Sequence, residues 1–185
     1  MIVIDLKIKI NYSNIMTIKY KRICLIGMSG VGKSYFGNLI AKKYKLPFLD
    51  TDTLIEASIP ISIKEYLKTH DEESFLSLEE KMILGISFPK QIIIATGGST
   101  VYSKKTMSYL KQHCTVIYLN DSFKNIQKRT TNFDKRGIVM KGRKSIENVY
   151  KDRLNLYKTW SDITITYPNN ISFKNMISLI EKKIL

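Results

Sequence analysis

The residues with the most specific chemical pattern run from Gly27 to Ser34 and read Gly-Met-Ser-Gly-Val-Gly-Lys-Ser. They fit the spacing G-x-x-x-x-G-K-[ST], with a short apolar run before them and helical spacing after them. Glycines let backbone N–H groups turn inward around phosphates, and the start of a helix adds its positive end. This phosphate loop predicts a site for ATP with Mg²⁺. The expected nucleotide contacts are Gly27, Ser29, Gly30, Val31, Gly32, Lys33 and Ser34.

Two side chains of the phosphate loop have predicted roles of their own. Lys33 is expected to bind the β- and γ-phosphates and to follow the charge as it moves during phosphoryl transfer. Ser34 is expected to place its hydroxyl on Mg²⁺. These roles are common to kinases and to nucleotide-dependent switches, so the loop alone does not choose between them.

A pair of carboxylates, Asp50 and Asp52, follows the second predicted strand, at 47–49. Ligands of open α/β sheets bind at the carboxyl ends of the strands. One carboxylate could hold a magnesium-bound water, and the other could accept a proton from an attacking hydroxyl. The alternative is that both simply cap the next helix, since Asp is a favoured N-cap.

Paired glycines, Gly97 and Gly98, end the third predicted strand, at 91–95. Without side chains, they allow a ligand to approach the backbone and to use its N–H groups. A plain tight turn is the alternative.

The elements around these motifs alternate between strand and helix. Short apolar runs predict strands at 23–26, 47–49, 91–95, 114–119 and 163–167. Helical spacing and a capping pattern predict helices at 33–44, from 62, and at 71–86, 103–112, 122–130, 145–158 and 171–184. Strands separated by helices predict an α/β protein whose parallel sheet is covered on both faces.

Composition narrows the class further. The chain has 185 residues and is 44% hydrophobic, which predicts one compact domain and excludes intrinsic disorder. Its apolar runs are only a few residues long, so we expect no membrane span and no secretory signal. Cys24 and Cys114 are predicted to be buried strand thiols. The cytoplasm is therefore the expected compartment.

The formal charge of +14 is unevenly distributed, with +3 over residues 1–100 and +11 over residues 101–185. Such a field favours anionic partners, either a phosphorylated or carboxylated ligand or a nucleic acid. Solvated lysines on the surface are the simpler interpretation. The basic run at 141–144 is the best candidate for nucleic acid, a partner that we disfavour.

From about residue 21 onward, the order of motifs resembles the shikimate kinase family, small P-loop kinases of the nucleoside monophosphate kinase type. The matching motifs are Asp50-Thr51-Asp52, Phe75 to Glu79, Gly97-Gly98-Ser99, Arg129-Thr130, Arg136-Gly137 and Arg153 to Tyr157. The resemblance implies a three-layer P-loop domain at 21–185 behind an N-terminal extension at 1–20. It also implies a five-stranded parallel sheet in the order 2-3-1-4-5 and a mobile lid at about 131–144.

The activity implied by the resemblance is transfer of the γ-phosphoryl group of ATP to the 3-hydroxyl of shikimate, in aromatic amino-acid biosynthesis by way of chorismate. Asp52 would bind the acceptor's hydroxyls and act as the base. Gly97 and Gly98 would contact the acceptor, and Arg153 would pair with its carboxylate.

On the nucleotide side, the resemblance implies that Asp50 helps to hold Mg²⁺ through water and that Arg129 lies against the adenine. Arg136 would close from the lid and stabilise the γ-phosphate. Arginine suits these tasks, because its fork pairs with phosphate and its plane stacks on bases. A monomer with no membrane partner is expected.

Three positions depart from the family pattern: Leu76 replaces a second carboxylate-binding Arg, Ser99 replaces a third Gly, and Gly137 replaces a Pro that would stiffen the lid. All three lie on the acceptor or lid side. A related kinase for another small hydroxylated acceptor is therefore an alternative. Two further alternatives are a nucleotide-binding protein that has lost phosphotransfer and a basic ATPase that acts with nucleic acid.

Overall fold

The computed structural model describes residues 20–130, 133, 137–168, 172 and 175–184. Most of the predicted N-terminal extension, at 1–19, lies outside the described residues. So do positions 131–132 and 134–136 of the predicted lid, including Arg136.

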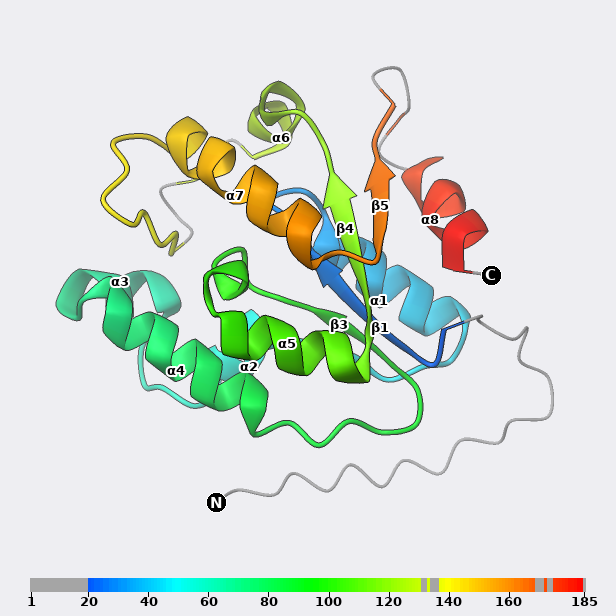
Figure 1. Ribbon diagram of the computed structural model, residues 1–185, viewed down its shortest axis with the longest axis horizontal. Coiled ribbons are helices and arrows are strands. Elements are labelled where there is room, and N and C mark those ends of the chain that lie inside the picture. The colour runs from blue at the N-terminus through cyan, green and yellow to red at the C-terminus, as the bar shows by residue number, and fades with distance from the viewer. Residues whose placement is uncertain (1–19, 131–132, 134–136, 169–171, 173–174, 185) are drawn as a thin grey trace.

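Five parallel strands form a single sheet in the order β2-β3-β1-β4-β5 (Figure 1). They are β1 (Arg22–Ile26), β2 (Phe48–Asp50), β3 (Ile92–Ala95), β4 (Thr115–Asn120) and β5 (Ile163–Thr166). Pairing is in parallel register throughout, with Ile23 opposite both Ile93 and Thr115. This topology confirms the predicted fold class and strand order.

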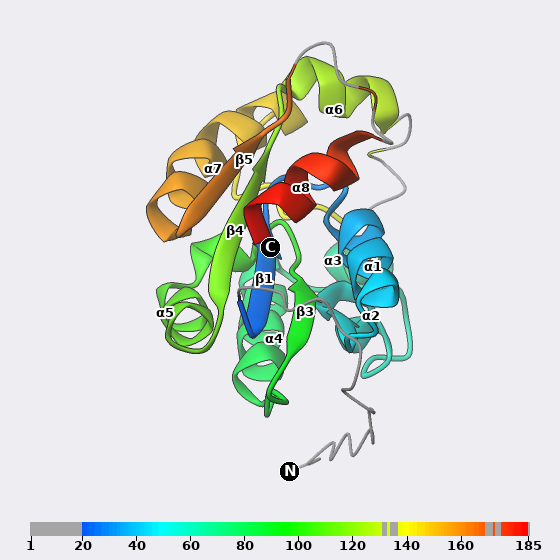
Figure 2. The ribbon, with the colours of Figure 1, turned by 90° about the vertical axis from the view of Figure 1, so that its right-hand side faces the viewer.

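Helices cover both faces of the sheet. Figure 2 shows α5 (Lys104–His113) and α7 (Ile146–Trp160) on one face, with α1 (Lys33–Lys43) and α8 (Met176–Ile184) on the other. The remaining helices are α2 (Thr51–Glu56), α3 (Ile63–Thr69), α4 (Glu72–Leu84), the 3₁₀ helix η1 (Thr100–Tyr102) and α6 (Phe123–Arg129). None of the helices in the described part of the chain is long and apolar enough to cross a bilayer.

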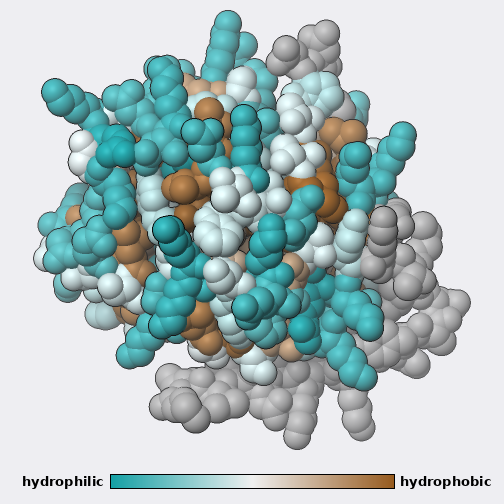
Figure 3. Space-filling view, in the orientation of Figure 1, coloured by the Kyte–Doolittle hydropathy of each residue, from teal (hydrophilic) through white to brown (hydrophobic). Residues whose placement is uncertain are grey.

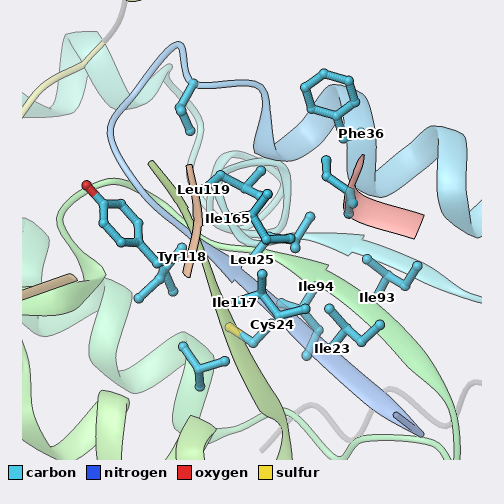
Figure 4. Close-up of a cluster of buried hydrophobic side chains, with 14 of the residues drawn as sticks. Ile23, Cys24, Leu25, Phe36, Ile93, Ile94, Ile117, Tyr118, Leu119 and Ile165 are labelled. Atoms are coloured by element: carbon cyan, nitrogen blue, oxygen red, sulfur yellow. The ribbon is translucent and has the colours of Figure 1, made fainter. Parts of the chain in front are cut away.

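The sheet itself forms the main core, because helices exclude water from both of its faces. Figure 4 shows Ile23, Leu25, Ile93 and Ile117, which lie on one face of three adjacent strands. Phe36 of α1 closes the core from one side and is fully buried. In contrast, the face drawn in Figure 3 is largely covered by hydrophilic side chains, with small hydrophobic patches between them.

Side-chain caps start the helices α2 to α7, each through a Ser or Asp that accepts from a backbone N–H two or three residues ahead. These caps satisfy N–H groups that have no partner inside the helix. Helix α1 is different: its N-cap is Gly32, which has a left-handed conformation. No side chain of the N-cap therefore accepts from the first N–H groups of this helix.

The structure adds two short elements, α2 and η1, that the sequence did not predict as helices. Helix α8 is described from Met176, whereas residues 171, 173 and 174 of its predicted range lie outside the described residues. Cys24 is a buried strand residue as predicted. Cys114 is buried too, but it caps the end of α5, so its assignment to a strand was wrong.

Candidate active site

The phosphate loop connects β1 to α1 along the carboxyl ends of the strands. Gly27, Gly30 and Gly32 have φ angles of 143°, 85° and 105°, values that side chains disfavour. A Cβ on Gly27 would also stand 2.6 Å from the carbonyl oxygen of Leu119 in β4. Glycine is therefore required by both backbone conformation and space.

Lys33 lies folded over this loop and is only 6% exposed. Its Nζ donates to the carbonyl oxygens of Gly27, at 2.8 Å, and Met28, at 3.1 Å. With the uncapped start of α1, the loop thus gathers a cation and backbone donors in one place. This donor set fits a polyphosphate.

The opposite wall of the loop is formed by the end of α6. A Cβ on Gly30 would overlap the side chain of Thr130. Arg129, one residue earlier, forms an ion pair with the buried Asp121 at 2.5 Å. Its guanidinium also lies 5.7 Å from the ring centre of Tyr167. The predicted adenine contact is therefore held at the edge of the phosphate loop.

Asp50 and Asp52 have different environments at the junction of β2 and α2. Asp50 Oδ1 accepts from the backbone N–H groups of Asp52, at 3.0 Å, and Thr53, at 3.4 Å. Asp50 is thus the N-cap of α2, the alternative that the sequence left open, and its magnesium role stays a prediction. Asp52 lies in the first turn of α2 with its side chain exposed.

Five residues from three helices and the loop after β3 meet beside the phosphate loop, and we call them the acceptor cluster: Asp52, Glu79, Gly97, Gly98 and Arg153. A Cβ on Gly97 would stand 2.7 Å from Asp52 Oδ1 and closer still to Glu79 Oε1. A Cβ on Gly98 would stand 3.0 Å from Arg153 Nη1 and 3.4 Å from the backbone nitrogen of Ser29. The two glycines thus bring the acceptor cluster next to the phosphate loop.

Arg153 is the largest fully buried polar side chain of the described residues, at 1% exposure. Its Nη2 donates to the carbonyl oxygen of Val139 at 2.6 Å, and its guanidinium lies 4.9 Å from the Tyr102 ring centre. Its Nε has no hydrogen-bond partner within the described chain. A buried cation with an unused donor fits an anionic ligand, because an unpaired buried donor is costly.

Glu79 of α4 is 2% exposed, and sequence reasoning gave it no role. Its two oxygens accept from the hydroxyls of Ser99, at 3.0 Å, and Thr100, at 2.7 Å. Burial raises the pKa of Glu79 to about 7, with a smaller contribution from Asp52, while the two hydroxyls act in the opposite direction. This carboxyl therefore titrates near neutral pH.

Residues 137–144 of the predicted lid, which we call the lid from here on, dock onto α3 and α4. Met140 and Lys141 donate their backbone N–H groups to the carboxylate of Glu72, at 2.5 and 2.7 Å. A Cβ on Gly137 would stand 2.7 Å from the Ile63 side chain, so the glycine permits a close approach. The sequence suggested only a looser lid at this position.

Leu76 packs into a small hydrophobic cluster of the protein. It is 9% exposed and packs with Ile55, Ile63, Phe75 and the lid residue Val139. On its outer side, Leu76 lines a groove of about 570 Å³ between α4 and α5. Leu76, at the position where the family pattern has Arg, thus helps to hold the lid through its contact with this cluster.

Sequence reasoning missed three polar residues that organise the site. Thr51 Oγ1 accepts from the backbone N–H of Gly97 at 3.0 Å and joins the ends of β2 and β3. Asp121 follows β4 directly and holds Arg129, so its position at a strand end was an available signal. Glu79 lay inside the quoted Phe75 to Glu79 motif, but its partners Ser99 and Thr100 are distant in sequence.

The fold and the site together define a P-loop kinase for a small molecule: the sheet order, phosphate loop and helical coverage are those of that class. A family profile described as shikimate kinase matches residues 29–182. The chain belongs to the shikimate kinase family, and it is an ATP-dependent kinase.

Relatives match over most of their length. The chain is 33% identical over 176 residues to the shikimate kinase of Francisella tularensis subsp. novicida, covering 91% of this chain and 99% of that protein. It is 31% identical over 164 residues to the enzyme of Dictyoglomus turgidum, covering 86% and 95%. The solved structure of shikimate kinase from Acinetobacter baumannii in complex with shikimate is 26% identical, with a TM-score of 0.76, and covers 89% of this chain and 92% of that one.

Proposed function

We propose that this protein transfers the γ-phosphoryl group of ATP to the 3-hydroxyl of shikimate. The observation that carries the proposal is the acceptor cluster. It places the carboxylate of Asp52, the bare backbone of Gly97 and the buried guanidinium of Arg153 beside the phosphate loop. A ligand with both hydroxyls and a carboxylate matches these groups. Relatives named as shikimate kinases support the same acceptor.

The nucleotide is assigned to the phosphate loop and the end of α6. Lys33 would exchange its bonds to the loop carbonyls for the β- and γ-phosphates, and the positive end of α1 would face phosphate oxygens. Arg129, held by Asp121, would lie against the adenine. Arg136, which lies outside the described residues, remains the predicted lid contact to the γ-phosphate.

The proposed transfer has a simple balance of atoms. The acceptor's 3-hydroxyl oxygen forms a bond to the γ-phosphorus while the bond from phosphorus to the oxygen bridging β and γ breaks. The hydroxyl proton passes to Asp52, and ADP leaves. Most of the acceleration would come from alignment and from stabilisation of the phosphoryl charge by Lys33.

The donor set also fits magnesium, because the hydroxyl of Ser34 and the carboxylate of Asp50 are the oxygen ligands that this ion prefers. When bound, Mg²⁺ would supply charge neutralisation at the phosphates. Ser34 is exposed at the start of α1, as a ligand to an incoming ion must be. The cytoplasm and the monomer stay predictions from the sequence.

A second candidate is a kinase for another small hydroxylated acceptor. The packing of Leu76 into a hydrophobic cluster favours it, because that position then offers no charge to a carboxylate. The bond from Ser99 to Glu79 also alters the wall of the acceptor cluster. Neither Leu76 nor Ser99 is among the predicted contacts to ATP.

The two candidates are distinguished by the product. The protein would be incubated with ATP, Mg²⁺ and either shikimate or a panel of small polyols, hydroxy acids and nucleosides, and ³¹P NMR would locate the new phosphate ester. We expect an ester on the 3-hydroxyl of shikimate. An ester formed only on another compound would support the second candidate and contradict the first.

A further inference from the structure

The residue that the proposed transfer leaves unused is Glu79, which lies at the centre of the acceptor cluster. Its Oε1 and the Oδ1 of Asp52 both border the place where a Cβ on Gly97 would stand. An acceptor that contacts the backbone of Gly97 therefore comes as close to Glu79 as to Asp52. Both carboxyl groups would face the same ligand.

The charge around Glu79 is poorly balanced. Among the described residues it takes part in no ion pair, and its hydrogen bonds come from the neutral hydroxyls of Ser99 and Thr100. Arg153 of α7 is the cation that acts on Glu79 and lowers its pKa, and the acceptor's carboxylate is also proposed to use it. Glu79 and the acceptor's carboxylate would thus share one guanidinium.

Among the described residues, no other element packed on α4 forms an ion pair with Glu79. Asp52 of α2 adds a negative charge, and Tyr157 of α7 is a neutral phenol whose pKa burial raises to about 12. On the side of α5, Lys105 pairs with Glu80 rather than with Glu79. On the side of α3, the contact with α4 is made by the rings of Tyr66 and Phe75.

We propose that Glu79 is a specificity-determining residue that admits the anionic acceptor only while its own carboxyl carries a proton. The proposal rests on the proposed function in so far as the acceptor is a carboxylate. Protonated Glu79 removes one negative charge from the cluster and can offer an O–H to the ligand. Ionised Glu79 repels the acceptor's carboxylate and competes with it for Arg153.

Glu79 is only 2% exposed, and burial raises its pKa to about 7. Its carboxyl group therefore gains or loses its proton within the physiological pH range. A change in this protonation should alter the affinity for the acceptor. Above that pH, the fraction of protein able to bind an anionic acceptor falls by up to about tenfold per pH unit. The hydrogen bonds of Glu79 come from Ser99 and Thr100 rather than from the phosphate loop, so phosphate binding at Lys33 should not follow the same curve.

The experiment measures KM for shikimate and kcat from pH 6 to pH 9 in the wild type, in Glu79→Gln and in the control Glu80→Gln. Glutamine has the shape of the protonated acid and cannot ionise, whereas Glu80 bonds Ser103 and Lys105 outside the cluster. We expect KM to rise above about pH 7 in the wild type and in Glu80→Gln, by up to about tenfold per pH unit. In Glu79→Gln the KM should stay flat across this range, whereas Glu80→Gln should keep the wild-type kcat as well as the wild-type KM profile.

A rise in KM that is equally steep in Glu79→Gln would overturn the proposal, as would a flat wild-type curve. Ser99→Ala gives an independent check, because the Ser99 hydroxyl favours the ionised form of Glu79. Its removal should move the onset of the KM rise to higher pH. An unchanged onset would contradict the assigned contact.

Urea unfolding of the ligand-free wild type and Glu79→Gln separates this proposal from the choice of acceptor. A raised pKa in the folded state stabilises the protein below the unfolded value of 4.5, and this contribution is lost as pH rises to about 7. Relative to Glu79→Gln, the wild type should lose stability across that window. A flat difference would overturn the proposal. If the wild type loses stability across this window but has no activity on shikimate, the result would contradict the proposed acceptor and still support the titration of Glu79.

Discussion

Lys33 is the residue that we propose to bind the transferred phosphate, and its buried Nζ donates to the carbonyl oxygens of Gly27 and Met28. Lys33→Ala is expected to lower kcat by about a hundredfold to a thousandfold, the usual effect of losing one electrostatic contact to the transition state. Steady-state ADP release would measure it.

The control for that change is Lys42→Ala, an exposed lysine of the same helix, which should keep near-normal turnover. Both variants should unfold cooperatively in urea. A Lys33→Ala protein with wild-type kcat would show that the loop does not act on the transferred phosphate.

Asp52 is the proposed base, and its exposed carboxylate beside Gly97 can be tested without a large change in shape. Asp52→Asn is expected to remove phosphotransfer and to leave ATP affinity within about twofold, since Lys33 and the loop are untouched. Turnover and nucleotide titration by calorimetry measure the two quantities. Glu56→Gln, on the same helix, is the matched control. Near-normal turnover in Asp52→Asn would contradict the proposed base.

Residues in continuous motifs could be predicted from the sequence, whereas residues defined by distant partners could not. The phosphate loop is local: glycine spacing, Lys33 and the following helix all lie within one segment. The capping role of Asp50 was recognisable as an alternative for the same reason. The environment of Glu79 depends on hydroxyls about twenty residues away, and no local pattern reports such a contact.

At the scale of elements, the lid is joined to α4 by the carboxylate of Glu72, which accepts two backbone N–H groups. Glu72→Ala removes both bonds, each worth about 1.5–3 kcal/mol when the acceptor is charged. We expect trypsin to cleave after Lys141 and Arg143 at least about tenfold faster, since local opening becomes easier. The cleavage rate, followed by mass spectrometry, is the measurement.

Glu73→Ala is the matched control for the lid. Within the described part of the chain, the carboxylate of Glu73 pairs with the side chain of Lys141 alone, and Glu73 is itself 76% exposed. Its loss should therefore change cleavage little. Equal rates in the two variants would mean that Glu72 does not hold the lid.

The predicted elements agree best with the structure where a long apolar or periodic run exists, as in β1, β3, β4 and α7. Helix α2 has only six residues and begins directly at the end of β2, so its sequence carries less than two turns of periodicity. The 3₁₀ helix η1 is shorter still. The strand order came from family resemblance, because residue spacing alone does not say which strands are neighbours.

For the whole molecule, the main question is what the net charge of +14 does. Several cations of the basic second half have assigned partners: Arg129 pairs with Asp121, Arg143 with Asp152, and Arg153 is buried in the acceptor cluster. Addition of RNA or DNA at low salt is therefore expected to leave ATP turnover unchanged within about twofold. Stimulation that falls steeply with salt would instead support the nucleic-acid-dependent ATPase.

The central claim, that this kinase phosphorylates shikimate, is tested most directly by ADP release from ATP and Mg²⁺ with and without shikimate, at acceptor concentrations into the millimolar range. Turnover that depends on shikimate and saturates with it is the predicted result, and it would show that Leu76 is compatible with the reaction. Tight ATP binding with no acceleration by shikimate would contradict the claim.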